Sequence, residues 1–132
     1  MSIKLVTIDV EERLLNRNHV TTDKVKQAIA QAKSIGVKIV VTTGRPYLGV
    51  VALLKELELT DPGDYVITYN GGMVLAADTG LEVARKGLTY QDYLRIDTLA
   101  ESLAISSHAV TATHLYTSNR DVSPYTVEES FV

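Results

Sequence analysis

The chain has no cysteine among its 132 residues. Disulfide bonds, thiolate metal sites and cysteine nucleophiles are therefore excluded, and the composition is compatible with a cytoplasmic protein. No apolar run approaches the roughly 20 residues that a membrane-spanning helix needs. The first residues lack the charged-then-apolar layout of a secretory signal and have the pattern of a strand. We therefore expect a cytoplasmic protein with no membrane partner.

Clusters of positive charge are also lacking. The 13 Lys and Arg residues are scattered and are outnumbered by 16 Asp and Glu residues, for a formal net charge of −3. Without a basic patch or stripe, we expect no nucleic-acid partner. His19, His108 and His114 do not share a metal-ligand spacing. The serines near His108 lack nucleophile-elbow glycines, so a serine hydrolase is not predicted either.

The first part of the chain alternates strand-like and helix-like patterns. Near-continuous apolar runs at 3–10, 37–44 and 65–71 are typical of strands buried on both faces. Between them, 21–36 and 45–59 have helical spacing, the first with Thr21 or Thr22 as a cap and the second opened by Pro46. This order predicts an α/β fold with a partial Rossmann-like parallel sheet covered by helices.

The pattern changes at residue 73. Residues 73–88 resemble a hairpin that turns at Asp78-Thr79-Gly80, and a helix is expected from about Thr89 to Ala104. A strand-like run at 109–119 follows. We predict two parts, a core at 1–72 and a partial α/β cap subdomain at 73–132.

Polar residues follow each of the three core strands. They are Asp9, the run Thr43-Gly44-Arg45, and the run Asn70-Gly71-Gly72. Ligands of parallel sheets gather at the carboxyl ends of the strands, so these three endings predict one ligand site.

Several stretches resemble the Cof-type phosphatases of the haloacid dehalogenase superfamily, which dephosphorylate sugar phosphates and related metabolites. The stretches are KLVTIDVEERLL, VVTTGRPYLGV, PGDYVITYNGG, LTYQDY and LYTSNRDVSPYTVEESFV. The resemblance extends over essentially the whole chain and covers the front half of a typical member. It implies a haloacid-dehalogenase-like fold, a Mg²⁺ cofactor and a small phosphorylated metabolite as substrate.

The resemblance also assigns roles in the first motif. Asp9 matches the nucleophile that forms an aspartyl phosphate, and Glu11 stands where the family has an Asp that acts as general acid and base. The same two residues are the expected magnesium ligands. Glu12 and Arg13 replace the Gly and Thr of the family motif, which predicts backbone strain and a cation beside Asp9.

The other expected contacts to phosphate come from the next two strand ends. Thr43 matches the phosphate-binding Thr, with Thr42 as a competing register, and Gly44 and Arg45 follow it. Asn70 matches the Asn of the turn that faces the substrate.

The family's Lys and acidic metal-binding loop come after the cap, and this chain ends inside the cap. Gly63-Asp64 precedes a strand, so it is expected at the opposite end of the sheet and not in the site. Phosphoryl transfer to a carboxylate needs a clamp of cations. We therefore expect a truncated phosphatase with weak or no activity. The alternative is a non-catalytic pseudo-enzyme that acts as an oligomeric or anion-binding module.

Three further predictions concern the charged run after Asp9, the run 43–45 and the edge of the first strand. Glu11, Glu12 and Arg13 could be a solvated, mutually paired charge run that adds little stability. The run 43–45 could be a helix N-cap without a ligand. The first strand is expected to have an unpaired apolar edge, which predicts a homodimer or higher homo-oligomer.

Overall fold

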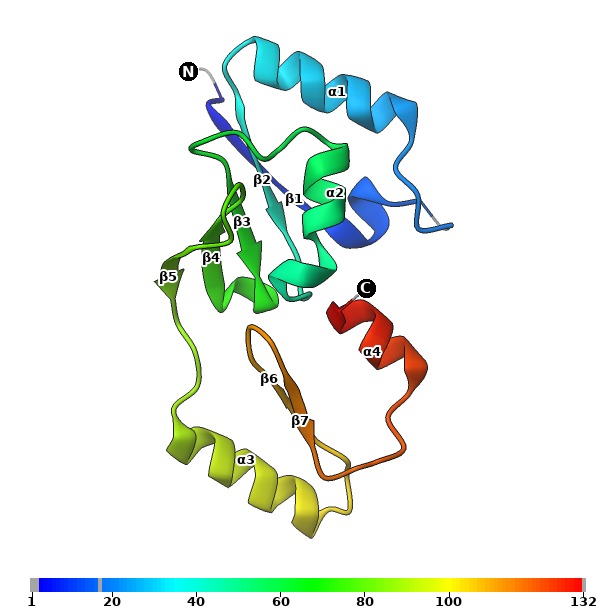
Figure 1. Cartoon of the computed structure of the whole chain (residues 1–132), viewed down its shortest axis with the longest axis vertical. Helices are drawn as coiled ribbons and strands as arrows, with labels where there is room; N and C mark the ends of the chain where they lie inside the picture. Colours follow the sequence, from blue (N-terminus) through cyan, green and yellow to red (C-terminus); the bar gives the residue numbers. More distant parts are fainter. Residues whose placement is uncertain (1–2, 17, 132) are drawn as a thin grey trace.

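The computed structural model describes residues 3–16 and 18–131 (Figure 1). It contains a five-stranded sheet in the order β1-β2-β3-β4-β5 and a separate two-stranded sheet, β6-β7. The strands are β1 (Leu5–Asp9), β2 (Lys38–Thr42), β3 (Tyr65–Thr68), β4 (Met73–Ala76), β5 (Glu82–Arg85), β6 (His108–Val110) and β7 (Leu115–Thr117). The α-helices are α1 (Asp23–Ser34), α2 (Val51–Glu56), α3 (Tyr90–Ser102) and α4 (Pro124–Phe131). Short helical turns are η1 (Val10–Leu14), η2 (Tyr47–Gly49) and η3 (Tyr69–Gly71).

The first three strands run parallel, which confirms the predicted α/β fold. Asp9 is in register with Thr42, and Thr42 is in register with Ile67. The carboxyl ends of the three strands therefore lie nearly level at one edge of the sheet. The antiparallel strands β4 and β5 extend the same sheet beyond β3.

Helix α1 begins and ends as the sequence indicates. Of the two candidate caps, Thr22 is the N-cap, and its hydroxyl accepts a hydrogen bond from the Val25 N–H at 3.4 Å. Gly36 follows the helix with φ +82°, a conformation that glycine adopts without steric cost, and the chain then enters β2. Ile29 is the buried residue of this helix and packs in the core.

The helix expected over 45–59 is interrupted, so that prediction is wrong in part. The 3₁₀ turn η2 is followed by Val50, which has non-helical dihedral angles, and α2 starts after it. Pro46 is extended and caps η2 instead of opening an α-helix. Val50 is only 1% exposed and packs in the hydrophobic core, so tertiary packing overrides the local helical pattern here.

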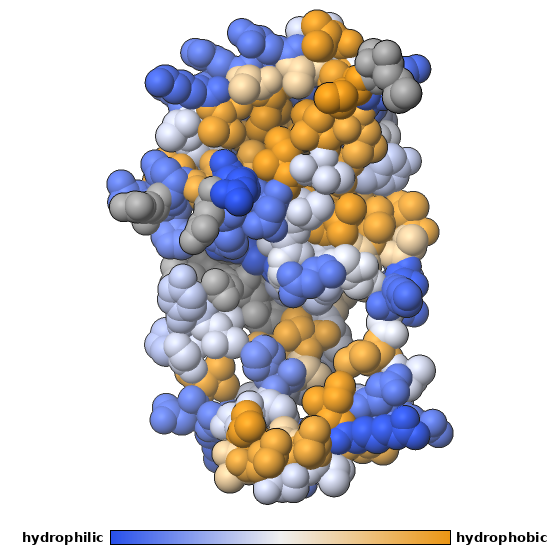
Figure 2. Space-filling model, turned by 180° about the vertical axis from the view of Figure 1, so that it is seen from behind, coloured by the Kyte–Doolittle hydropathy of each residue, from blue (hydrophilic) through white to orange (hydrophobic). Residues whose placement is uncertain are grey.

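The hydrophobic core lies between the five-stranded sheet and the helical segments next to it. Its buried members are Val10, Leu14, Ile29, Ile39, Val41, Val50, Leu54, Leu57, Leu59, Val66, Leu75 and Ala77. β2 is the most buried strand, whereas β1, at the edge of the sheet, alternates between exposed and half-buried residues. Seen from behind, hydrophobic residues gather over the upper part of the molecule and again at its lower end (Figure 2).

The hairpin expected at 73–88 is present as β4 and β5, with Gly80 at φ +70° in its turn. Because β4 pairs with β3, the sheet continues across residue 72. The division into a core at 1–72 and a cap at 73–132 therefore does not coincide with the end of the sheet, and it stays a prediction about domains.

The helix expected near Thr89 is also present, with Thr89 as the N-cap of α3. The single strand expected at 109–119 is instead the hairpin β6-β7, so that prediction is wrong. The physical reason is a tight turn at its centre, where Thr111 N–H donates to the His114 carbonyl at 2.8 Å. The final segment, for which no element was expected, forms α4. Within the described residues, no helix is both long and apolar enough to cross a membrane.

Candidate functional site

Asp9 is the last residue of β1 and is exposed at the carboxyl edge of the sheet. Immediately after it the chain turns into the π-helix η1, whose Leu15 N–H donates to the Val10 carbonyl at 3.2 Å. Val10 and Leu14, 1% and 2% exposed, anchor this turn in the core. Buried residues on η1 therefore fix the position at which the Asp9 carboxylate meets solvent.

Glu11, on η1, forms an ion pair with Arg45 from the loop after β2. Arg45 donates from Nε at 3.0 Å and from Nη2 at 2.9 Å, and both bonds end on the same oxygen, Oε1 of Glu11. The side chains are 20% exposed for Arg45 and 44% for Glu11. Glu11 and Arg45, which were predicted separately as site residues, are therefore paired although they lie 34 residues apart in the sequence. Their charges neutralise each other.

Thr43 is buried and connects the loops that follow β2 and β3. Its N–H donates to the Ile67 carbonyl at 3.0 Å, and its carbonyl accepts from the Asn70 N–H at 3.1 Å. The hydroxyl accepts from the Arg45 N–H at 3.0 Å. This is a local turn ahead of η2, whose N-cap is Pro46, so the expectation that 43–45 is a helix N-cap is wrong. The hydroxyl also has a proton of its own to donate.

Asn70 lies against the backbone of Gly44. A Cβ at Gly44 would come within 3.1 Å of Asn70 Oδ1 and 3.2 Å of its Nδ2, so glycine permits this close approach. Asn70 itself has φ 54° and ψ 38°, the left-handed conformation that Asn tolerates better than most residues. The second and third strand endings therefore meet, as the sequence predicted.

The first motif differs in detail from the sequence expectations. Glu11 forms an ion pair with Arg45, so the prediction of a charge run paired only within itself does not describe Glu11. Arg13 is exposed and has interactions of its own. The Glu12 side chain lies outside the described part of the structure, and the backbone strain expected there stays a prediction.

The residues do not by themselves fit a magnesium ion. Within residues 3–16 and 18–131, the structure has no group of three or more His, Cys, Asp or Glu side chains that could hold a metal. Of the two carboxylates expected to bind Mg²⁺, Asp9 is exposed, and Glu11 is engaged by Arg45. Magnesium needs oxygen ligands in octahedral geometry, and a carboxylate paired with a guanidinium is a poor ligand.

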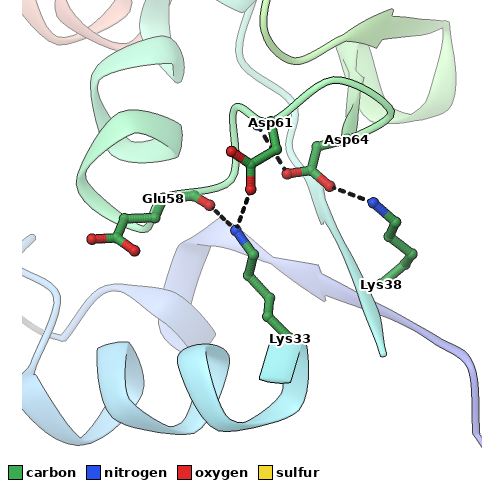
Figure 3. A network of polar contacts seen from close by, with 5 residues as sticks. All are labelled: Lys33, Lys38, Glu58, Asp61 and Asp64. Carbon is green, nitrogen blue, oxygen red and sulfur yellow. Dashed lines mark hydrogen bonds and ion pairs between the residues drawn. The ribbon is translucent and has the colours of Figure 1, made fainter. Parts of the chain in front are cut away.

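Asp64 lies at the opposite end of the sheet, as expected, and takes part in a separate network (Figure 3). Its buried carboxylate accepts from Lys38 Nζ at 3.0 Å and from the Asp61 N–H at 3.1 Å. Lys33 of α1 donates to Asp61 Oδ2 at 3.1 Å and to the Glu58 carbonyl. Because Lys38 opens β2, this network secures the amino ends of the strands and has no part in the site.

Sequence reasoning missed a contact between the site and the second sheet. The Tyr69 hydroxyl, beside Asn70, donates to the Thr111 carbonyl at 2.9 Å in the β6-β7 turn. Burial raises the pKa of the Tyr69 phenol above its ordinary value, so the protonated form that donates is favoured further. No local pattern in the sequence indicates a partner 42 residues away. The Glu11–Arg45 pair was missed for the same reason, although both residues were singled out.

Comparison with known proteins agrees with this architecture. A family model described as haloacid dehalogenase-like hydrolase matches residues 6–132. "Putative phosphatase M6_Spy0533" of Streptococcus pyogenes serotype M6 is 47% identical over 130 residues, which are 98% of this chain and 48% of that protein. "Putative phosphatase YxeH" of Bacillus subtilis is 44% identical over 129 residues, again 98% and 48%.

A solved structure supports the fold. The crystal structure of a haloacid dehalogenase-like hydrolase from Bacteroides thetaiotaomicron superposes with a TM-score of 0.78 at 22% identity, covering 97% of this chain and 48% of that one. The chain spans about half the length of the curated relatives it matches. With the family model matched over nearly its whole length, the chain belongs to the haloacid dehalogenase-like hydrolase family.

Proposed function

We propose that the chain carries the nucleophile and the phosphate-contacting loops of a phosphatase acting on sugar phosphates or similar small phosphorylated metabolites. The observation that carries this proposal is the exposed Asp9 carboxylate at the end of β1, level with Thr42 and next to the loops of Thr43 and Asn70. The names of the two relatives cited above, each of which contains the word phosphatase, support the same reaction class.

The chemistry follows from the position of Asp9. A carboxylate oxygen attacks phosphorus, the P–O bond to the sugar oxygen breaks, that oxygen takes a proton from solvent water, and an aspartyl phosphate forms. A water molecule then attacks the phosphorus of that intermediate and gives its proton to solvent, which releases inorganic phosphate and returns the free carboxylate. The Thr43 hydroxyl accepts from the Arg45 N–H and has a proton of its own that it can donate to a phosphate oxygen.

The supply of positive charge at the site limits the rate of this reaction. Both attacking carboxylate and phosphate are anions, so the reaction needs cations that neutralise the charge as it develops. Arg45 lies at the site, and Glu11 already neutralises its charge. The described residues do not by themselves fit Mg²⁺, so they supply no metal-bound positive charge. We propose that the 132-residue chain forms the phosphoenzyme slowly and turns over weakly or not at all.

The contact between the Thr43 and Asn70 loops also supports a second candidate function. A non-catalytic module that binds small anions, alone or as an oligomer, needs the Thr43 and Asn70 loops but not the Asp9 carboxylate. The two proposals therefore differ in whether Asp9 accepts a phosphoryl group.

The test is phosphoryl transfer to the protein itself. The purified chain is incubated with acetyl phosphate and its intact mass is measured, followed by peptide sequencing by mass spectrometry. We expect an added phosphoryl group on Asp9 that is lost in Asp9→Asn and kept in Asp23→Asn, an exposed carboxylate in the first turn of α1. Absence of any Asp9 adduct would favour the anion-binding module.

A further inference from the structure

The side chain of Arg45 is fixed by several contacts. Nε and Nη2 both donate to Glu11 Oε1, and Nη1 donates to the Gly49 carbonyl at a long 3.5 Å. The backbone N–H of Arg45 is held by the Thr43 hydroxyl. Only a fifth of the Arg45 side chain is exposed, so its guanidinium has little freedom to turn toward another partner while Glu11 holds it.

The Glu11 carboxylate binds Arg45 in the way that a bound phosphate anion would. It is an anion, its oxygen accepts two N–H bonds, and it reaches Arg45 from a different element, η1. Phosphate oxygens would bind a guanidinium in the same manner, through charge-assisted hydrogen bonds. An anion bound to Arg45 must therefore either displace Glu11 or accept the repulsion of its carboxylate.

We propose that Glu11 is an internal competitor that occupies Arg45 and lowers the affinity of the site for phosphate. Glu11 is then a positioning residue for Arg45 whether or not it also takes part in proton transfer. The inference rests on the proposed phosphate site, and it adds that the identity of residue 11 sets the strength of phosphate binding. Because Glu11 is 44% exposed, the pair is weak enough for a bound phosphate to displace it.

Inorganic phosphate is the probe, titrated into the 132-residue chain at low ionic strength. The readout is the backbone amide NMR signals of Thr43, Gly44 and Asn70. Glu11→Gln keeps the size of the side chain and removes its charge. We expect it to lower the dissociation constant for phosphate roughly two- to fivefold, the range of an exposed ion pair.

Glu82→Gln is the matched control. Glu82 on β5 pairs with Arg85 at 3.4 Å, so this variant removes the same charge and also disrupts a Glu–Arg pair, but on a different strand from the site. We expect it to leave phosphate affinity unchanged apart from the small effect of net charge. Glu11→Ala is a second variant, which also removes the hydrogen bonds that the Gln side chain of Glu11→Gln can form to Arg45. We expect it to raise phosphate affinity as well.

The dependence on Arg45 decides the proposal. In the Arg45→Gln background, Glu11→Gln should give no further gain in phosphate affinity. The proposal is overturned if the Glu11 variants bind phosphate no better than the unaltered chain, or if their gain persists without Arg45. Its outcome is separate from that of the proposed function, because phosphate affinity can rise in Glu11→Gln even if Asp9 never accepts a phosphoryl group.

Discussion

The sheet region and the segment after it differ in what holds them together. Every described side chain that is buried lies between Val10 and Ala77. By contrast, α3 has no buried residue, and its apolar side chains Leu94, Ile96 and Leu99 are 43%, 50% and 59% exposed. Packing stabilises the sheet region, whereas α3 is specified by local signals such as its capping box. The two regions should therefore respond differently to the same substitution.

Matched leucine substitutions should show the largest difference. Leu54 on α2 is fully buried, so Leu54→Ala should reduce the free energy of unfolding by about 2–5 kcal/mol. Leu99→Ala, on exposed α3, should change it by less than about 0.5 kcal/mol. Urea unfolding followed by circular dichroism measures both. Equal losses would mean that α3 is packed against a partner, within the chain or in another copy.

We propose that the chain self-associates, because both regions expose apolar side chains. A change in oligomeric state should be the next largest effect. β1 is an edge strand in the described sheet, and its Leu5 is 54% exposed. Tyr116 on β7 is 55% exposed. Open edges and apolar patches favour pairing with another chain, so light scattering at low micromolar concentration should report a homodimer or larger.

The substitution Leu5→Lys distinguishes the edge of the sheet from α3 as the contact. A charge on the edge strand should lower the average mass if β1 forms the interface. Leu99→Lys serves as its counterpart on α3. A monodisperse monomer for the unaltered chain that melts cooperatively would contradict the proposal of an oligomer.

Acidification should give a smaller effect, confined to α3. Thr89 lowers the pKa of Asp92, because its hydroxyl and its N–H donate to the carboxylate at 2.6 and 3.1 Å. The ionised form is thus favoured in the folded helix. Its contribution is present above the ordinary pKa of an Asp and is lost as pH falls through the lowered value in the folded state.

Amide exchange measured by NMR along α3 can test this acid dependence. Amide exchange is base-catalysed and slows in acid by itself, so the readout is the protection factor, the ratio of the unstructured exchange rate to the observed one. The protection factor at the start of the helix should fall in acid in the unaltered chain, and Thr89→Ala should remove most of that fall. The first turn of α1, capped by Thr22, provides the internal reference. A fall in protection that is unchanged by Thr89→Ala would show that the capping box does not hold the start of α3.

Sequence patterns predicted the features that depend on neighbours in the chain. Apolar runs located the three parallel strands, the pair Thr21-Thr22 and Thr89 marked helix starts, and Asp78-Thr79-Gly80 marked a hairpin. The strand endings with Asp9, Thr43 and Asn70 followed from the same periodicity. These features need only a few residues of local context.

Features set by tertiary contacts could not be predicted in this way. Val50 interrupts a helical pattern because the core holds its side chain. The turn at Thr111 divides a run of strand-forming residues into two strands. The pairing of Glu11 with Arg45 depends on how η1 and the loop after β2 approach each other, and no spacing in the sequence encodes that approach.

Our central proposal is that Asp9 is a nucleophile and that the described residues alone do not provide the set of cations that rapid phosphoryl transfer needs. Hydrolysis of p-nitrophenyl phosphate by the purified chain, with and without Mg²⁺, tests it most directly, with Asp9→Asn as the control. We expect release of p-nitrophenol at or near background under both conditions. Robust Mg²⁺-dependent hydrolysis that disappears in Asp9→Asn would contradict it, because the 132-residue chain would then assemble a metal site of its own.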